Sequence, residues 1–415
     1  MHHLEHWDIL LSNNVNKKAF IAMLLSRKAT EKLSYLNPLK GMLFSDIAIT
    51  EYIEREYRFD TIEIEIETNR KLSSLSSGER KKAFLKYCLN QKPDYLIIDN
   101  PLDHLDQNSR ESLKSILEDL SKSVRLIQLV NRHADLLPFI KNKAQIKDNS
   151  FSLSAINLNQ TKQLLVEKSS IPSENQQQDD INTELVYLDK ISISFNDRKI
   201  INSISWSIKK GEFWQLVGPN GSGKSTLLAM ISGDNPKGYG QNLYLFGKKK
   251  GSGETIWEIK HKIGVYATAM TDLFQKRETV ENMILSGYFD SIGLYIEPTS
   301  LQNQTVEKWL RLIKLSHLKN NYFNQISIGQ QRVVLIIRAI IKQPLLVILD
   351  EPLEGLDDEN VALVSQLITI LKKETTITII CVSHRIESTL IPDLIYELIP
   401  SEKGSIGRII QTATN

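Results

Sequence analysis

The chain has 415 residues, of which 41% are hydrophobic, and its 51 basic and 49 acidic residues leave a net charge of +2. This composition excludes a disordered or fibrous protein, and the balanced charge gives no bulk signature for nucleic acid. The sequence contains no apolar stretch as long as a membrane span, and its first ten residues lack the pattern of a secretory leader. We expect a soluble, cytoplasmic protein of two or three domains.

Three short motifs mark the first half of the chain: residues 75–80 (LSSGER), 95–101 (YLIIDNP) and 104–106 (HLD).

The two cysteines, Cys88 and Cys381, lie in apolar segments without disulfide or metal-ligand spacing, so we expect both in the core. The basic runs at residues 80–82 and 248–250 are expected to be solvated faces rather than binding patches.

A polar, glutamine-rich segment at residues 157–184 separates the two halves and is typical of a flexible linker. The predicted organisation is therefore a first domain at residues 1–156, a linker at 157–184 and a second domain at 185–415. Apolar strands alternate with longer helical patterns, which predicts an α/β fold with mainly parallel sheets. A few antiparallel strands are expected at the start of the second domain.

The second half contains a phosphate-binding loop pattern, GPNGSGKST, directly after the apolar run at residues 213–217. In such a loop, glycines let backbone N–H groups surround phosphate oxygens, the lysine reaches the outer phosphates, and a hydroxyl binds Mg²⁺. A helix predicted from residue 225 adds its positive end to the same anion site. The predicted nucleotide-binding residues are Gly218, Pro219, Asn220, Gly221, Ser222, Gly223, Lys224, Ser225 and Thr226.

The two halves are copies of one design. Residues 326–332 (ISIGQQR), 345–352 (LLVILDEP) and 355–357 (GLD) repeat the three motifs of the first half at one constant offset. An ungapped match over three motifs is very improbable by accident, which indicates an internal duplication. Residues 7–18 also align with residues 214–225, so the first half carries an eroded phosphate-binding loop.

These motifs resemble those of ATP-binding cassette (ABC) ATPases, which have a P-loop NTPase fold. The resemblance assigns Walker A to residues 218–226, the signature to 326–330, Walker B to 346–351, the D-loop to 355–357 and the switch histidine to His384. Phe195 resembles the aromatic residue that stacks on adenine; its alternative role is that of a strand core residue. The resemblance covers nearly the whole chain and implies two tandem cassettes, the first degenerate and shortened.

Cassettes of this family pair head to tail, so the resemblance implies two unequal nucleotide sites, of which one is chemically complete. There Ser225 and Asp350 would hold Mg²⁺, Glu351 would polarise the attacking water, and His384 would contact the γ-phosphate. The signature of the first half would close over the same ATP with Ser76, Ser77, Gly78 and Glu79.

The other site is broken. Leu11 and Asn16 replace loop glycines, Lys18 replaces the Mg²⁺-binding hydroxyl, and Asn100 replaces the general base. The switch position aligns with Arg132, beside His133. We expect the first half to hydrolyse nothing and to contribute mainly its signature.

The second half, which carries the chemically complete motifs, departs from the family pattern at two positions. Ile328 replaces a signature glycine, and the glutamine expected after the strand at residues 263–266 is replaced by Ala267 or Thr268. In the wider family that glutamine senses Mg²⁺ and couples hydrolysis to membrane partners. The first half is also much shorter between its loop lysine and its signature, which argues against a symmetric pair of membrane partners.

Residues 238–240, 248–257 and 284–293 more specifically resemble the twin-cassette ModF family, also called photorepair protein PhrA. The leading expectation is a cytoplasmic twin-cassette ATPase, which could also sit at the inner membrane. Its partners would be ATP, the other cassette, and either a membrane permease or an unknown soluble protein. The alternatives are a transporter subunit for molybdate or another anion, a ribosome-associated twin-cassette translation factor, and a regulatory ATP-binding protein.

Overall fold

The computed structural model describes residues 4–59, 71–156, 171–172, 183–195, 198–273, 277–384 and 386–411. The chain divides into two compact units, Met1–Lys162 with Gly355–Glu359, and Gln163–Glu354 with Asn360–Asn415. Most of the segment 157–184 lies outside the described residues, so the linker stays a prediction. In the part of the chain that is described, every helix is too short or too polar to cross a membrane.

The first unit is built on a five-stranded parallel sheet in the order β2-β3-β4-β1-β5. Ile97 of β3 packs with Phe20 of helix α1, whereas its neighbour Ile98 packs with Phe84 of helix α3. Because successive side chains of a strand point to opposite faces, the helices cover both sides of this sheet. The elements are β1 (Trp7–Leu11), α1 (Lys17–Leu25), η1 (Glu31–Leu36), β2 (Gly41–Phe44), α2 (Asp46–Phe59), η2 (Leu72–Ser74), α3 (Ser77–Asn90), β3 (Tyr95–Asp99), α4 (Gln107–Leu120), β4 (Arg125–Val130), η3 (His133–Asp135) and β5 (Asn142–Ile146).

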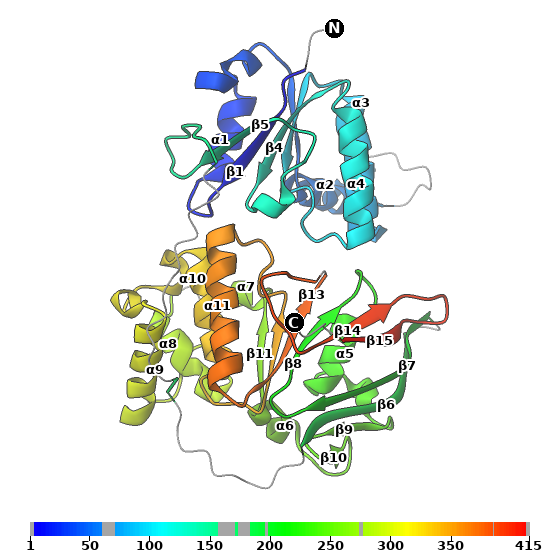
Figure 1. Ribbon diagram of the computed structural model, residues 1–415, viewed down its shortest axis with the longest axis vertical. Helices are drawn as coiled ribbons and strands as arrows, with labels where there is room; N and C mark the ends of the chain where they lie inside the picture. Colours follow the sequence, from blue (N-terminus) through cyan, green and yellow to red (C-terminus); the bar gives the residue numbers. More distant parts are fainter. Residues whose placement is uncertain are drawn as a thin grey trace. The chain divides into compact units, whose positions relative to one another are not determined.

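The second unit contains a six-stranded sheet in the order β11-β12-β13-β8-β14-β15, parallel except for β15 (Figure 1). Its elements up to β11 are β6 (Glu184–Phe195), β7 (Arg198–Lys209), β8 (Phe213–Val217), α5 (Lys224–Ile231), η4 (Pro236–Gly238), β9 (Leu243–Leu245), β10 (Lys248–Lys249), α6 (Ile256–Lys262) and β11 (Ile263–Ala267). They continue with α7 (Met270–Leu273), α8 (Val280–Leu285), η5 (Ser286–Phe289), α9 (Ser300–Leu312), η6 (Ser316–Leu318), η7 (Phe323–Gln325), α10 (Ile328–Ile340), β12 (Leu346–Asp350), α11 (Asp358–Glu374), β13 (Thr378–Ser383), β14 (Leu394–Ile399) and β15 (Ile406–Gln411).

The two sheets share one topology. Strands β2-β3-β4-β1-β5 of the first unit correspond in order and direction to β11-β12-β13-β8-β14 of the second. The loop that aligns with the phosphate-binding loop follows the corresponding strand in each unit, β1 and β8. The predicted P-loop NTPase fold and internal duplication are therefore confirmed.

An antiparallel sheet, β10-β9-β6-β7, packs on the second unit's main sheet, as expected for the start of this half. An aromatic cluster joins the two sheets. Trp206 of β7 stacks on Tyr396 of β14 with ring centroids 4.4 Å apart, and meets Trp214 of β8 edge-on at 5.4 Å. Since Trp214 lies four residues before Gly218, where the phosphate-binding loop begins, this cluster supports the strand from which the loop departs.

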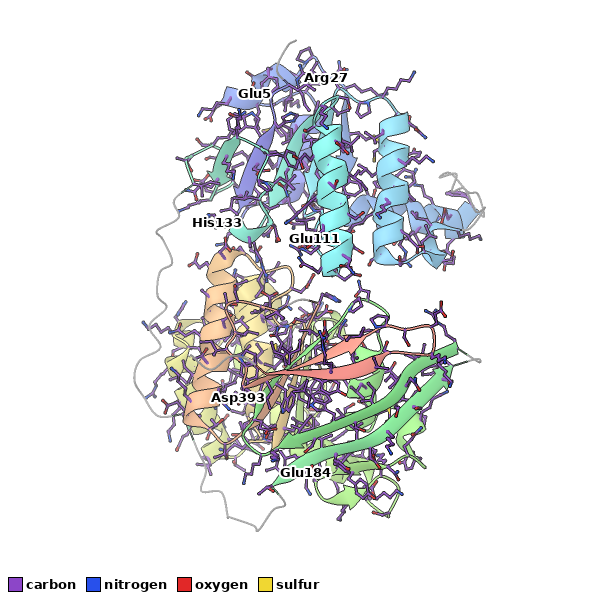
Figure 2. All side chains as sticks on the ribbon, turned by 45° about the vertical axis from the view of Figure 1, so that its right-hand side comes forward. Glu5, Arg27, Glu111, His133, Glu184 and Asp393 are labelled. Carbon is purple, nitrogen blue, oxygen red and sulfur yellow. The ribbon has the colours of Figure 1, made fainter. Side chains whose placement is uncertain are left out.

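The beginning of β8 is fixed by Asp393, which is labelled in Figure 2. Its carboxylate accepts the backbone N–H of Phe213 at 2.8 Å, and its own N–H donates to the Phe213 carbonyl at 2.8 Å. Strand β8 is thus anchored at its beginning, and the phosphate-binding loop follows its end.

The two expectations about cysteines and basic runs have different outcomes. Cys88 and Cys381 are buried, as predicted. Lys248 and Lys249 are exposed, but Lys250 is only 3% exposed, with its ammonium 4.9 Å from the centre of the Tyr239 ring. Lys81 is likewise 3% exposed, so the solvated-face prediction was wrong for these two lysines.

Candidate functional site

The phosphate-binding loop of the second unit leaves open space beside Gly221. It follows the buried strand β8, and Gly221 and Gly223 have φ values of +76° and +94°, which L-residues with side chains rarely adopt. A Cβ added at Gly221 would meet no heavy atom within 4 Å among the described residues. At Gly223 a Cβ would come within 3.0 Å of Ile201 and 3.1 Å of Ile200, which places strand β7 against the loop.

The groups around this space fit an anion. Gly223 precedes helix α5, which has no side-chain cap hydrogen bond at its positive end. The Oγ of Ser222 is buried and has no hydrogen-bond partner among the described residues. Lys224 donates to the carbonyls of Gly218 and Pro219 at 2.6 and 3.1 Å, so its ammonium lies across the loop. Phosphate oxygens would accept hydrogen bonds from these donors.

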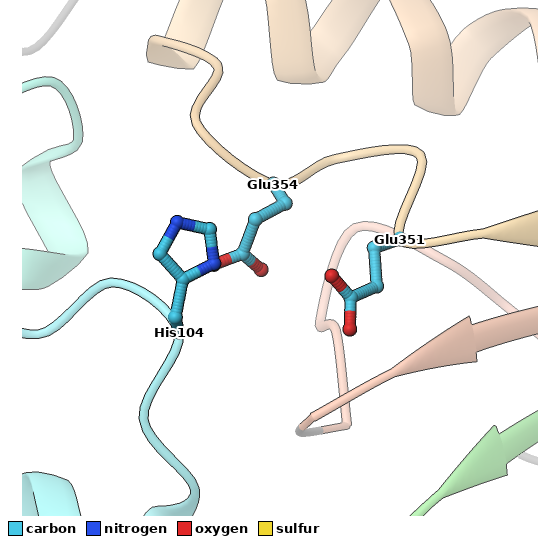
Figure 3. A group of neighbouring side chains, drawn as sticks. All are labelled: His104, Glu351 and Glu354. Atoms are coloured by element: carbon cyan, nitrogen blue, oxygen red, sulfur yellow. The ribbon is translucent and has the colours of Figure 1, made fainter. Parts of the chain in front are cut away.

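Walker B places two adjacent acidic residues at the end of β12. Glu351 follows this strand, where the loop that carries Glu354 begins (Figure 3). Burial and the nearby charge of Glu351 raise the pKa of Asp350, while the charges of Lys224 and His384 act against this shift. Ser225 is exposed and carries a hydroxyl. A divalent cation held by Asp350 and Ser225 would offset the cost of the buried Asp350 charge, and carboxylate and hydroxyl oxygens are ligands that Mg²⁺ prefers. The residues present therefore fit Mg²⁺ and ATP.

Glu351 is held in an unusual backbone conformation, with φ +54°. Its N–H donates to the carbonyl of Val382 on the neighbouring strand β13 at 3.0 Å. His384 follows β13 and brings its Nε2 to 2.5 Å from Oε1 of Glu351. The predicted general base and switch histidine therefore lie together beside Asp350.

Phe195 ends strand β6 and is 42% exposed, which excludes its alternative role as a strand core residue. Its ring carries the ammonium of Lys237 at 4.1 Å from its centre, and that ammonium also donates to the Ser194 carbonyl. An exposed aromatic face on the hairpin that contacts Gly223 fits a stacking platform for a base.

The corresponding loop of the first unit is filled by its own side chains. Asn16 stands where Gly223 stands in the second unit, and its side chain caps helix α1 by accepting the N–H of Ala19 at 3.0 Å. Lys17 forms an ion pair with Asp99 at 2.7 Å. The Asn16 side chain thus caps the positive end of helix α1, and the loop lysine is paired with Asp99.

The strand register corrects the switch position of the first unit. Asp99 pairs with Leu129 as Asp350 pairs with Val382, so the residue equivalent to His384 is Asn131. The prediction of Arg132 at this position was wrong, because the sequence alone does not show which residues of β4 pair with β3. Asn100 donates to the side-chain oxygen of Asn131 at 3.1 Å, so an amide pair replaces Glu351 and His384.

The two signature segments have the same local geometry. The Ser76 hydroxyl caps helix α3 by accepting the Glu79 N–H, and the Glu79 carboxylate accepts the Ser76 N–H. Ser327 and Gln330 form the same capping box on α10. Gly78 and Ser77 lie in the first turn of α3. Ile328, which replaces a glycine in the second signature, is 48% exposed.

Sequence reasoning missed the buried cation on each signature helix, Arg332 on α10 and Lys81 on α3. Both donate to backbone carbonyls of the loop after Walker B or its counterpart. The signal was present in the sequence, because these two basic residues occupy the same place in the repeat.

The family model "ABC transporter" matches residues 201–354. The ABC transporter ATP-binding protein ModF of Escherichia coli (strain K12) is 38% identical over 334 residues, which cover 77% of this chain and 68% of that protein. An uncharacterised ABC transporter ATP-binding protein of Schizosaccharomyces pombe is 33% identical over 70% of this chain and 61% of its own length. Among solved structures, a model of ribosome-bound archaeal Pelota and ABCE1 covers 98% of this chain and 75% of its own, with 15% identity and a TM-score of 0.65, which shows the fold alone.

Proposed function

Because the chain belongs to the ATP-binding cassette family of ATPases and is homologous to ModF, we propose that it hydrolyses ATP at one composite site. The Walker motifs of the second cassette, residues 185–415, supply the chemistry at this site. The signature of the first cassette, residues 1–156, closes over the same nucleotide. The first cassette's own loop takes no part in hydrolysis.

The observation that carries this proposal is the contrast between the two loops. Helix α5 begins without a side-chain cap, whereas the Asn16 side chain caps helix α1. The ammonium of Lys17 is neutralised by Asp99 at 2.7 Å, whereas the ammonium of Lys224 donates to the carbonyls of Gly218 and Pro219 in its own loop. One loop is therefore suited to a polyphosphate, and the other is closed by its own side chains.

Each residue of the proposed site has a defined role. The loop N–H groups and Lys224 bind the phosphates, Ser225 and Asp350 hold Mg²⁺, and Phe195 stacks on the base. Bound Mg²⁺ supplies charge neutralisation at the transferring phosphoryl group. Glu351 orients and deprotonates water, while His384, within reach of Glu351, contacts the γ-phosphate. Ser76, Ser77, Gly78 and Glu79 at the positive end of α3 complete the phosphate contacts.

The test is Mg²⁺-dependent ATP hydrolysis by the full chain and three variants. Glu351→Gln removes the general base and Ser76→Arg blocks the first signature, so each should lower kcat by about 100-fold. Ser327→Arg makes the same substitution in the second signature, which we assign to the inactive site, and should retain turnover. A result in which Ser327→Arg is inactive and Ser76→Arg is active would reverse the assignment of the two sites.

A second candidate function rests on the 38% identity to a protein named as an ABC transporter ATP-binding protein. In this case the same ATPase would power uptake of molybdate or another anion through a membrane permease. Affinity purification from membranes solubilised in mild detergent distinguishes the two. A permease recovered in fixed ratio to the chain supports the transporter role, and its absence supports action without one.

A further inference from the structure

The second cassette lacks the glutamine that its family places after strand β11, and Thr268 stands beside Walker B instead. Strand β11 pairs with β12 so that Ala267 lies opposite Asp350, which brings Thr268 next to Glu351. The Thr268 hydroxyl donates to the backbone carbonyl of Glu351 at 3.1 Å. A residue that replaces a long amide thus contacts the backbone of the proposed general base directly.

Arg332 of the signature helix α10 completes this contact. Its Nη1 donates to the Thr268 hydroxyl at 2.9 Å and to the Glu351 carbonyl at 3.2 Å, and its Nη2 donates to the Glu354 carbonyl at 3.1 Å. The side chain is only 6% exposed, and its guanidinium lies 5.6 Å from the centre of the Tyr266 ring. A rigid, planar donor fork bound to three acceptors fixes their relative positions.

These contacts hold Glu351 in an unusual backbone conformation. A non-glycine residue with a φ of +54° is strained and persists only where its surroundings determine it. The Glu351 N–H is held by Val382, and its carbonyl is held by Thr268 and Arg332. With both flanking peptide groups fixed, the direction in which the carboxylate leaves the backbone is also fixed.

The first cassette shows what the same position becomes without hydrolysis. Strand register makes Asp46 the counterpart of Thr268, and the repeat makes Lys81 the counterpart of Arg332. Lys81 pairs with Asp46 at 3.0 Å and donates to the carbonyls of Pro101 and Asp103. In the first cassette the cation therefore forms an ion pair with Asp46, whereas Arg332 of the second cassette contacts a hydroxyl that is bonded to Glu351.

We propose that Thr268 and Arg332 are positioning residues that hold the Glu351 backbone in its catalytic conformation. This inference rests on the proposed function, since it concerns the general base of that site. It assigns the positioning to a hydroxyl and a guanidinium from one cassette.

The test compares Thr268→Val, Thr268→Ser and Thr305→Val in the full chain. Thr268→Val removes the hydroxyl with little change in shape and should lower kcat about 10-fold while the KM for ATP stays unchanged, because only the base is misplaced. Thr268→Ser keeps the hydroxyl and should restore kcat. Thr305→Val, which removes a hydroxyl bonded to Leu301 in helix α9, is the matched control and should behave as wild type.

A second readout needs neither nucleotide nor activity. In the nucleotide-free chain, amide hydrogen exchange of the segment 351–354 should rise in Thr268→Val and stay unchanged in Thr305→Val. If Thr268→Val does not fold, Arg332→Lys, which loses the donor fork, should show the same lowered kcat and faster exchange. Unchanged kcat together with unchanged exchange would overturn the inference, as would an effect confined to KM. An active Glu351→Gln would overturn the proposed function, while the exchange comparison would still decide whether Thr268 holds this loop.

Discussion

Two lysines at equivalent positions, Lys17 and Lys224, show how single contacts separate a structural group from a binding group. Lys17 forms an ion pair with Asp99, whose carboxylate is only 6% exposed, and burial raises the pKa of that carboxyl. The ammonium of Lys224 donates to the carbonyls of Gly218 and Pro219 in its own loop. The first ammonium therefore stabilises the fold, and the second lies in the loop that we propose to bind the phosphates.

Exchange of each lysine for methionine should give opposite results. Lys17→Met leaves the Asp99 carboxylate buried without its partner and should lower the free energy of unfolding by about 1–3 kcal/mol, with turnover retained. Lys224→Met should lower turnover by about 100-fold, because a preorganised charge on the phosphates is lost. Urea denaturation and ATP hydrolysis measure both quantities on the same samples. Loss of turnover in a stable Lys17→Met variant would contradict the inactive role of the first loop.

At the scale of elements, local sequence rules predict what depends on neighbours in the chain. Strand β8, the loop at residues 218–226 and helix α5 lie where the phosphate-binding pattern places them, with the helix one residue longer at its start. The switch position of the first unit was predicted at Arg132 instead of Asn131, because it depends on which residues of β4 pair with β3. The burial of Lys81 and Lys250 was mispredicted because contacts with distant segments decide it, and a run of basic residues contains no information on those contacts.

The aromatic cluster between the two sheets of the second unit yields an element-scale prediction. Trp206→Ala removes a buried ring that touches both Trp214 and Tyr396, and should cost about 3–5 kcal/mol of unfolding free energy. Trp206→Phe should cost much less, since the indole N–H has no hydrogen-bond partner among the described residues. Trp257→Ala, at a position 71% exposed, is the control and should change stability by at most about 0.5 kcal/mol. Equal losses for Trp206→Ala and Trp257→Ala in denaturant titrations would rule out this role of the cluster.

At the scale of the whole molecule, the two cassettes share one fold but have different residues at equivalent buried positions. Both sheets keep the same strand order, while the loops at their ends have diverged. Gln215 in β8 donates to Ser383 at 2.9 Å, and its counterpart in β1 is Asp8, a fully buried carboxyl. Burial raises the pKa of Asp8 to about 7, although the Leu137 N–H donates to it. The two cassettes should therefore differ in how their stability responds to pH.

The direction of that response follows from proton linkage. Because the pKa of Asp8 is higher in the folded chain than in the unfolded chain, its contribution to stability is greatest at low pH and is lost as pH rises through about 7. The other oxygen of Asp8 and Oε1 of Gln128, its register neighbour on β4, have no hydrogen-bond partner among the described residues. Asp8→Asn would remove the buried charge and supply a donor for Gln128. It should raise the unfolding free energy of the first unit by about 1–3 kcal/mol at about pH 8 and have little effect at about pH 4.5. Urea denaturation at the two pH values measures this difference, and an equal effect of Asp8→Asn at both would mean that Asp8 does not titrate with folding.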